Sequence, residues 1–244
     1  MSEMEHEVSF KTSDGWLIKG SIHIPQGQRK VPGVVFIHGS RHESDAYGNL
    51  TSPGIPQTLN KHGIATLRID IRGRGASREP LVFNAMSPAA RDEVRADVSA
   101  AIEFLASQEG VNAKRIGIVA EQDTANYAVL AGAGDKRVAA FILISGRLTR
   151  NAKDTIAASR APVYCLVSKE DRRGFQDMTD AYLSSKSRNS RLLVFEGLAL
   201  GTTMFSTWRY ERPKEPPIDE LAGEWLTERL KTAGSAKNGR KKKR

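Results

Sequence analysis

Short runs of apolar residues recur along the chain and predict the strands of a buried sheet. Two alternating stretches come first, at 6–12 and 16–24, and the Asp14-Gly15 pair between them supplies the positive φ of a tight hairpin turn. Six continuous apolar runs follow, at 31–39, 63–70, 114–120, 136–145, 161–167 and 190–196. Such runs are typical of parallel strands covered on both faces. The pattern therefore predicts a mostly parallel sheet that begins with an antiparallel hairpin.

Helical periodicity lies between the apolar runs. The clearest helix begins at Ser87-Pro88, with a serine N-cap and a proline in the first turn, and is expected to run to about Gln108. Further helices are predicted after residue 123, over about 174–186, and over about 218–230 before Gly234. Strands that alternate with crossover helices predict an α/β architecture with helices on both faces of the sheet. Only about 16 residues separate the sixth strand from the seventh, so no lid domain is expected.

Polar motifs follow three of the predicted strands, at the end of the sheet where α/β proteins carry their chemistry. The third strand leads into HGSRH at 38–42, the fourth into DIRGRGAS at 70–77, and the fifth into GIVAEQDTANYAVLAG at 117–132. In this order, over about residues 6–232, the motifs resemble the α/β-hydrolase fold and most closely its lidless esterase and dienelactone-hydrolase-like branch. The resemblance implies a Ser-His-acid site for ester or lactone hydrolysis and no cofactor.

An amide stands where the resembled family has its nucleophile. The family's G-x-S-x-G turn, laid over Ala120 to Thr124, puts Gln122 at the serine position and replaces both glycines. A carboxamide is neither acidic nor usefully nucleophilic. Because those glycines allow a strained turn and close packing, Ala120 and Thr124 predict a relaxed or slightly displaced turn. A shift of one residue would put Asp123 at the apex instead, as in family members that use an aspartate nucleophile.

The catalytic histidine of the family is also missing. The five histidines stand at 6, 23, 38, 42 and 62, all before the elbow, and the family's histidine position after the last strand carries Leu200. An aliphatic side chain cannot accept a proton. The acid position after the seventh strand corresponds to Asp171. A substitute catalyst would have to combine Asp123 with His38 or His42; the alternatives are helix-start electrostatics for Asp123, a solvated turn for Asp171, and packing or solvated roles for the histidines.

The resemblance also assigns an oxyanion site to the backbone amides of Ser40 and Asp123. Glu121 and Asp123 would repel a developing oxyanion there unless Arg41 or Arg72 neutralised them. The crevice would then suit a neutral or cationic ligand, or Gln122 would close it. The residues expected to surround it are His38, Gly39, Arg41, His42, Arg72 and Glu121.

The composition predicts one globular domain followed by a basic tail. The 244 residues, 39% hydrophobic and 27% charged, suit one globular domain, expected at 1–233. The last eight residues, KNGRKKKR, carry six basic side chains, and without them the net charge falls from +9 to +3. We expect 234–244 to be a disordered tail, with a weak polyanion contact through Lys237 to Arg244 as the alternative.

Several protein classes are excluded or disfavoured by the sequence. The single cysteine, Cys165, excludes an internal disulfide and a cysteine-based metal site, and no metal or cofactor is expected. The chain shows neither a secretory leader nor a membrane span, so a cytoplasmic protein is expected. We interpret the sequence as a pseudo-hydrolase, a non-catalytic binding or interaction module whose former active-site crevice takes a small-molecule ligand. The alternative is a hydrolase of small esters or lactones with a substitute set of residues.

Overall fold

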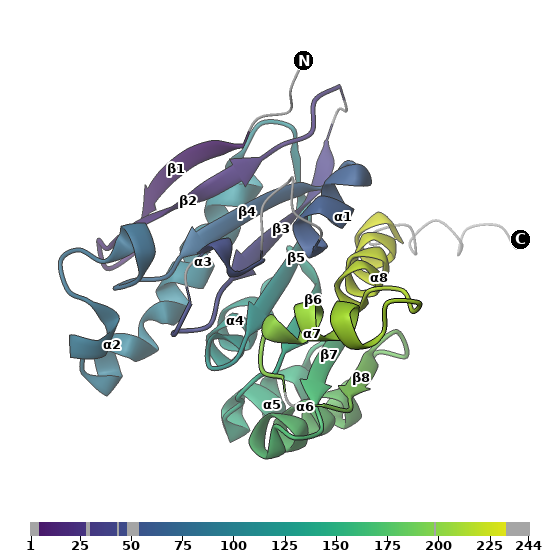
Figure 1. Cartoon of the computed structure of the whole chain (residues 1–244). Helices are drawn as coiled ribbons and strands as arrows, with labels where there is room; N and C mark the ends of the chain where they lie inside the picture. Colours follow the sequence, from purple (N-terminus) through teal and green to yellow (C-terminus); the bar gives the residue numbers. More distant parts are fainter. Residues whose placement is uncertain (1–4, 28–29, 43, 48–53, 198, 233–244) are drawn as a thin grey trace, which may run out of the picture.

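One eight-stranded sheet organises the part of the chain that the computed structural model describes, residues 5–27, 30–42, 44–47, 54–197 and 199–232 (Figure 1). The strand order is β1-β2-β4-β3-β5-β6-β7-β8. β2 is antiparallel to both β1 and β4, and all other neighbours are parallel. The strands are β1 (His6–Lys11), β2 (Leu17–His23), β3 (Val31–Ile37), β4 (Ala65–Asp70), β5 (Val111–Glu121), β6 (Val138–Ile144), β7 (Val163–Ser168) and β8 (Arg191–Phe195). The predicted α/β sheet with its leading hairpin is confirmed.

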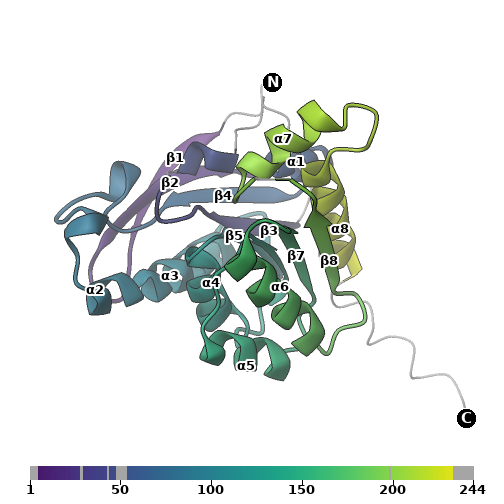
Figure 2. The same cartoon turned by 60° about the horizontal axis from the view of Figure 1, so that its bottom comes forward.

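Helices cover both faces of the sheet, which is why the central strands are apolar throughout (Figure 2). One face packs against α1 (Ile55–Lys61) and α8 (Ile218–Thr232), where Leu59 and Trp225 meet Phe36 in one buried cluster. The other face packs against α3 (Val94–Ser107), α4 (Thr124–Gly132), α5 (Arg150–Ala158) and α6 (Arg172–Ser184). Each fully buried large aliphatic side chain in these layers contributes about 1.5–3 kcal/mol.

The structure corrects the predicted helices in four places. The single helix expected from Ser87 to Gln108 is two, α2 (Pro88–Asp92) and α3, separated by a turn at Glu93, whose ψ is −2°. Ser87 does act as the N-cap, accepting from the amide of Ala90. Three short helices were not predicted, namely α1, α5 and α7 (Thr203–Glu211). β6 and β7 are joined through α5, and no lid domain interrupts them.

Two expectations fall outside or at the limit of the described chain. The predicted tail at 234–244, with Lys237 to Arg244, lies outside the described residues, as does the predicted domain end at 233. Within the described ranges, none of the helices has the length and apolar character needed to cross a membrane.

Candidate active-site crevice

A crevice of about 260 Å³ opens at the carboxyl end of β5. It lies where the loops after β3, β6 and β8 meet the turn that joins β5 to α4. Its lining residues are Ser40, Arg41, Gln122, Asp123, Arg147 and Leu200. Four of the six come from the positions that the sequence singled out around the family's nucleophile, its oxyanion site and its histidine.

The turn at Gln122 keeps a strained backbone. Gln122 has φ +50°, one of two described non-glycine residues in the left-handed region, and Ser145 at the end of β6 is the other. The amide of Gln122 donates to the carbonyl of Ile144 at 2.9 Å, and its carbonyl accepts from the amide of Arg147 at 2.8 Å. Of the two alternatives predicted from the sequence, a relaxed or a slightly displaced turn, the relaxed one was therefore wrong. The buried Thr124 is tolerated at a glycine position because its hydroxyl donates to the carbonyl of Glu121 at 2.8 Å.

The side chain of Asp123 accepts a hydrogen bond from a backbone amide that the resemblance assigns to the oxyanion site. The N–H of Ser40 donates to Asp123 Oδ1 at 3.0 Å. Asp123 also stands at the start of α4, where the helix dipole favours a negative charge. The chain thus supplies its own anion to a donor that an ester hydrolase would leave for the reacting oxygen.

Glu121 is a buried carboxylate that joins two loops beneath the crevice. Its Oε1 accepts from the amide of Gly39 at 2.9 Å and from His42 Nδ1 at 2.6 Å, and its Oε2 accepts from the amide of Thr202 at 2.9 Å. Burial by itself would raise the pKa of Glu121, but the hydrogen bonds from His42, Gly39 and Thr202 outweigh it and hold the pKa below its ordinary value. Glu121 is therefore an ionised structural hub.

The two expected imidazoles have separate roles. The His42 side chain is 30% exposed and pairs with Glu121. His38 is fully buried: its Nδ1–H donates to the carbonyl of Gly39 at 2.8 Å, and its Nε2 accepts from the amide of Ile71 at 3.2 Å. Burial lowers the pKa of His38, which keeps the ring neutral. Among the described residues the structure forms no hydrogen bond or ion pair between Asp123 and either imidazole.

Asp171, at the family's acid position, holds an arginine. Arg147 Nη2 donates to Asp171 Oδ1 at 2.7 Å and Nη1 donates to Oδ2 at 2.8 Å, a bidentate pair in which the Asp171 side chain is 4% exposed. Asp171 Oδ1 also caps α6 by accepting from the amide of Gly174. Arg147 was not predicted as a site residue from the sequence, although its place after β6, at the carboxyl end of the sheet, is a signal for it.

The loop after β8 closes the crevice at the family's histidine position. Leu200 lies there as an aliphatic wall and is 42% exposed. The next residue, Gly201, has φ +58°, and its amide donates to Ser145 Oγ at 2.9 Å. A Cβ at Gly201 would lie 2.7 Å from Glu121 Oε2 and 2.9 Å from Gln122 Nε2, so only glycine fits without displacement.

Arg72, expected near the crevice, lies in a different network. Its guanidinium is buried, and it pairs with Asp97 on α3 and with Asp14 in the hairpin turn, at 2.7 Å each. It also lies over the ring of Trp16, 5.2 Å from the ring centroid. Arg72 therefore ties the hairpin to α3 and makes no contact with Glu121, whose side-chain hydrogen bond comes from His42.

The described residues contain no group of three or more His, Cys, Asp and Glu side chains placed to hold a metal ion. The crevice instead presents two guanidiniums, one carboxylate and one amide. The Arg41 side chain forms no hydrogen bond or ion pair with any described residue.

The sheet, its strand order and the strained turn after β5 define a protein of the α/β-hydrolase fold. Within that class the chain belongs to the dienelactone hydrolase family, whose model matches residues 18–199.

Comparisons with individual solved structures show the same fold, and one curated relative is similar in sequence. A dienelactone hydrolase from Anabaena variabilis superposes with a TM-score of 0.71 at 20% identity, over 93% of this chain and 98% of that one. The Pyrococcus furiosus esterase Pf2001 superposes with a TM-score of 0.68 at 17% identity, over 93% of each chain. The thiohydrolase aneE of Aspergillus aculeatus is 29% identical over 138 residues, 57% of this chain. This chain spans only 40% of the length of that relative.

Proposed function

We propose that this chain is a pseudo-hydrolase, a non-catalytic member of its family that binds a small polar ligand in the crevice above Gln122. The observation that carries the proposal is the contact between the Ser40 amide and the Asp123 carboxylate beside an apex that holds an amide. Acyl transfer needs a nucleophile, a base and free donors for the oxyanion. At the positions where the family has its nucleophile and its base, this chain carries Gln122 and Leu200. The Ser40 amide, one of the expected oxyanion donors, is already bound to Asp123.

The lining of the crevice supports a ligand that carries an anionic group. Arg41 has no partner among the described residues. Arg147 uses Nη1 and one N–H of Nη2 for Asp171 and the carbonyl of Ser145, which leaves Nε and the second N–H of Nη2 as a donor fork. Carboxylates and phosphates accept from such a fork in a bidentate way. Asp123 Oδ2 would accept from a donor on the same ligand. This differs from the neutral or cationic ligand expected from the sequence.

Turnover of model substrates tests the absence of catalysis. Because relatives carry the names of esterases, lactone hydrolases and thiohydrolases, the panel comprises p-nitrophenyl esters of increasing acyl length, a small lactone and an acyl thioester. We expect no turnover above the buffer rate by the wild-type protein or by Gln122→Ala. Turnover that survives in Gln122→Ala and is lost in Asp123→Ala would instead assign the nucleophile to Asp123.

Thermal shift against a panel of small carboxylates and phosphates tests the ligand class. A ligand that binds only the folded state raises Tm with its concentration. We expect Arg41→Gln to abolish that shift without changing the Tm of the free protein, because the Arg41 side chain has no hydrogen-bond or ion-pair partner among the residues that the structure describes. Arg160→Gln is the matched control, since Arg160 is exposed and precedes β7 at the opposite end of the sheet. Equal shifts in both variants would exclude Arg41 from the site.

One observation favours a second candidate function, hydrolysis with His42 as the base. An imidazole held by a buried carboxylate is the arrangement that orients a general base, and His42 pairs with Glu121 at 2.6 Å. In this candidate His42 would activate a water, since the chain offers no hydroxyl at the apex. Turnover that disappears in His42→Ala but persists in Asp123→Ala would support it over the pseudo-hydrolase.

A further inference from the structure

The first strand leaves one edge of the sheet open. β1 is terminal in the strand order, so among the described strands only β2 pairs with it (Figure 1). Its exposed face carries Glu7, Ser9 and Lys11, and its other face carries the half-buried Val8 and Phe10. In the part of the chain that the structure describes, neither the Glu7 carboxylate nor the Lys11 ammonium has a hydrogen-bond or ion-pair partner. An open edge with unpaired backbone groups is a template for another strand.

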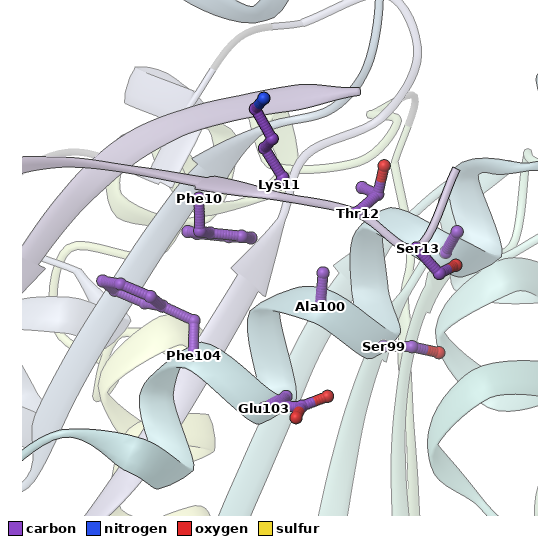
Figure 3. Close-up of a pocket in the computed structure, with 9 residues that line it drawn as sticks. Phe10, Lys11, Thr12, Ser13, Ser99, Ala100, Glu103 and Phe104 are labelled. Atoms are coloured by element: carbon purple, nitrogen blue, oxygen red, sulfur yellow. The ribbon is translucent and has the colours of Figure 1, made fainter. Parts of the chain in front are cut away.

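A groove of about 370 Å³ runs beside this edge, between β1 and α3 (Figure 3). Phe10 stacks on Phe104 of α3 at one end of it, with ring centroids 4.6 Å apart. Small side chains on α3, Ser99 and Ala100, form its floor, and Glu103 lies along its helical side. The groove therefore has an aromatic end and an acidic side, both next to an unpaired strand.

We propose that β1 pairs with β1 of a second copy of this chain in an antiparallel, two-fold arrangement centred on Ser9. In this register Glu7 lies opposite the partner's Lys11 and Lys11 lies opposite the partner's Glu7, so two cross-strand charge pairs form on the exposed face. The strand is thus complementary to itself in charge. A shift of the register by two residues removes this match.

The buried face of the strand fits the same register. Val8 lies opposite the partner's Phe10, which extends the apolar contact that Phe10 makes with Phe104. The partner's His6 lies opposite Thr12 and above the groove, on the side that carries Glu103. Charged side chains on an edge usually discourage pairing because like charges meet. Here the two signs are spaced so that unlike charges meet on both sides of the two-fold axis.

Charge reversal measured by sedimentation equilibrium over a concentration series tests the pairing. The wild-type mass is expected to rise from 26.8 kDa toward twice that value. Glu7→Lys or Lys11→Glu turns both attractive pairs into repulsive ones, and each should weaken the dimer about tenfold or more. The double variant E7K/K11E restores opposite charges and should recover the wild-type dissociation constant. Arg191→Glu, on the exposed opposite edge at β8, is the control and should change nothing.

A cross-link at the two-fold axis provides a readout that does not depend on affinity. Ser9→Cys places two thiols opposite each other, and oxidised glutathione should convert the protein to a disulfide-linked dimer. Val194→Cys, exposed on β8, is the matched control and should form little disulfide-linked dimer. Cys165 is buried and does not interfere. A monomer at every concentration, or a dimer unaffected by both charge reversals and not cross-linked through residue 9, would overturn the proposal.

Discussion

Gln122 has a left-handed backbone in the turn after β5, at the position where the resemblance places the family's nucleophile. A left-handed φ costs a glutamine on the order of 1–2 kcal/mol. The surrounding bonds hold it there, because the amide of Gln122 is fixed by Ile144 and its carbonyl by Arg147. The backbone geometry at this position therefore does not depend on a nucleophilic side chain. The hydrogen bonds with Ile144 and Arg147 hold the strained φ whether or not the residue takes part in a reaction.

Among the residues of the site, Glu121 is the one whose substitution we expect to destabilise the fold most. Glu121→Gln keeps the shape of the side chain but replaces one carboxylate oxygen with an amide nitrogen, which cannot accept. The oxygen replaced is either Oε1, which accepts from two donors, or Oε2, which accepts from one. We expect it to lower the free energy of unfolding at pH 7 by about 2–4 kcal/mol, because buried donors lose a charged acceptor. Glu196→Gln, whose side chain is 73% exposed, should stay within about 0.5 kcal/mol in the same urea titration.

The pH dependence of that difference follows from the pKa of Glu121. Its folded pKa lies below the ordinary value of 4.5, so the carboxylate contributes stability that is fully present above pH 4.5 and is lost as the pH falls through the folded pKa. The gap between wild type and Glu121→Gln should therefore be constant from pH 7 to pH 5 and narrow below 4.5. A gap that widens in acid would contradict the assignment of Glu121 as an ionised hub.

At the scale of elements, the first hairpin is attached to the helical layer through one guanidinium. Arg72 reaches Asp14 in the turn between β1 and β2 and Asp97 in the first turn of α3. The Trp16 ring lies over the same guanidinium. The hydrogen bond and charge of Arg72 hold the pKa of Asp14 down at about 2, against the opposing effect of burial. The position of the β1 edge thus depends on an ion network in which Arg72 and Asp97 are buried and Asp14 is exposed.

Arg72→Lys should loosen the hairpin selectively. A lysine presents one ammonium and cannot satisfy two carboxylates in bidentate fashion, so we expect a loss of about 2–3 kcal/mol in unfolding free energy. Hydrogen exchange should accelerate in residues 6–23 more than in β5 and β6. Arg95→Lys, exposed on α3, is the control and should leave exchange unchanged. Uniform acceleration across the sheet would indicate that Arg72 supports the whole core instead.

The sequence predicts the elements well where periodicity is strong and poorly where tertiary contacts decide. The apolar runs predict the sheet because a strand buried on both faces needs apolar residues throughout. α1, α5 and α7 are short, and such helices depend on packing more than on their own propensity. Glu93 breaks a pattern that looks continuous in sequence. At the site, the apex position of Gln122 and the wall at Leu200 follow from local motifs, whereas the pairs Arg147–Asp171 and His42–Glu121 join distant segments and leave no local signal.

The whole molecule retains the architecture of its family with the contacts of the site rearranged. The acid position holds an arginine, the oxyanion donor holds a carboxylate, and the histidine position holds an aliphatic wall. The first two contacts engage groups that the resemblance assigns to catalysis, namely the Asp171 carboxylate and the Ser40 amide. Restoration of the missing side chains alone should therefore not restore catalysis.

Reconstruction of a triad tests this at the scale of the molecule. We expect Q122S/L200H to remain unlabelled by a fluorophosphonate probe, since Asp171 is still bound to Arg147 and the Ser40 amide to Asp123. The further changes Asp123→Ala and Arg147→Leu release both groups and should produce labelling together with a burst of p-nitrophenol from the acetate ester. Addition of Asp171→Asn to that protein is the control and should suppress the burst. Equal labelling of the two-residue variant would show that neither contact is inhibitory.

The glycine at 201 fixes how a ligand can enter and leave. Gly201 lies close to Glu121 and Gln122, and the amide of its neighbour Thr202 donates to the Glu121 carboxylate. Movement of this segment away from the crevice would therefore break a hydrogen bond to a buried charge. The shape of the crevice in the free protein therefore decides which ligands fit, and a ligand broader than the crevice is not expected to bind.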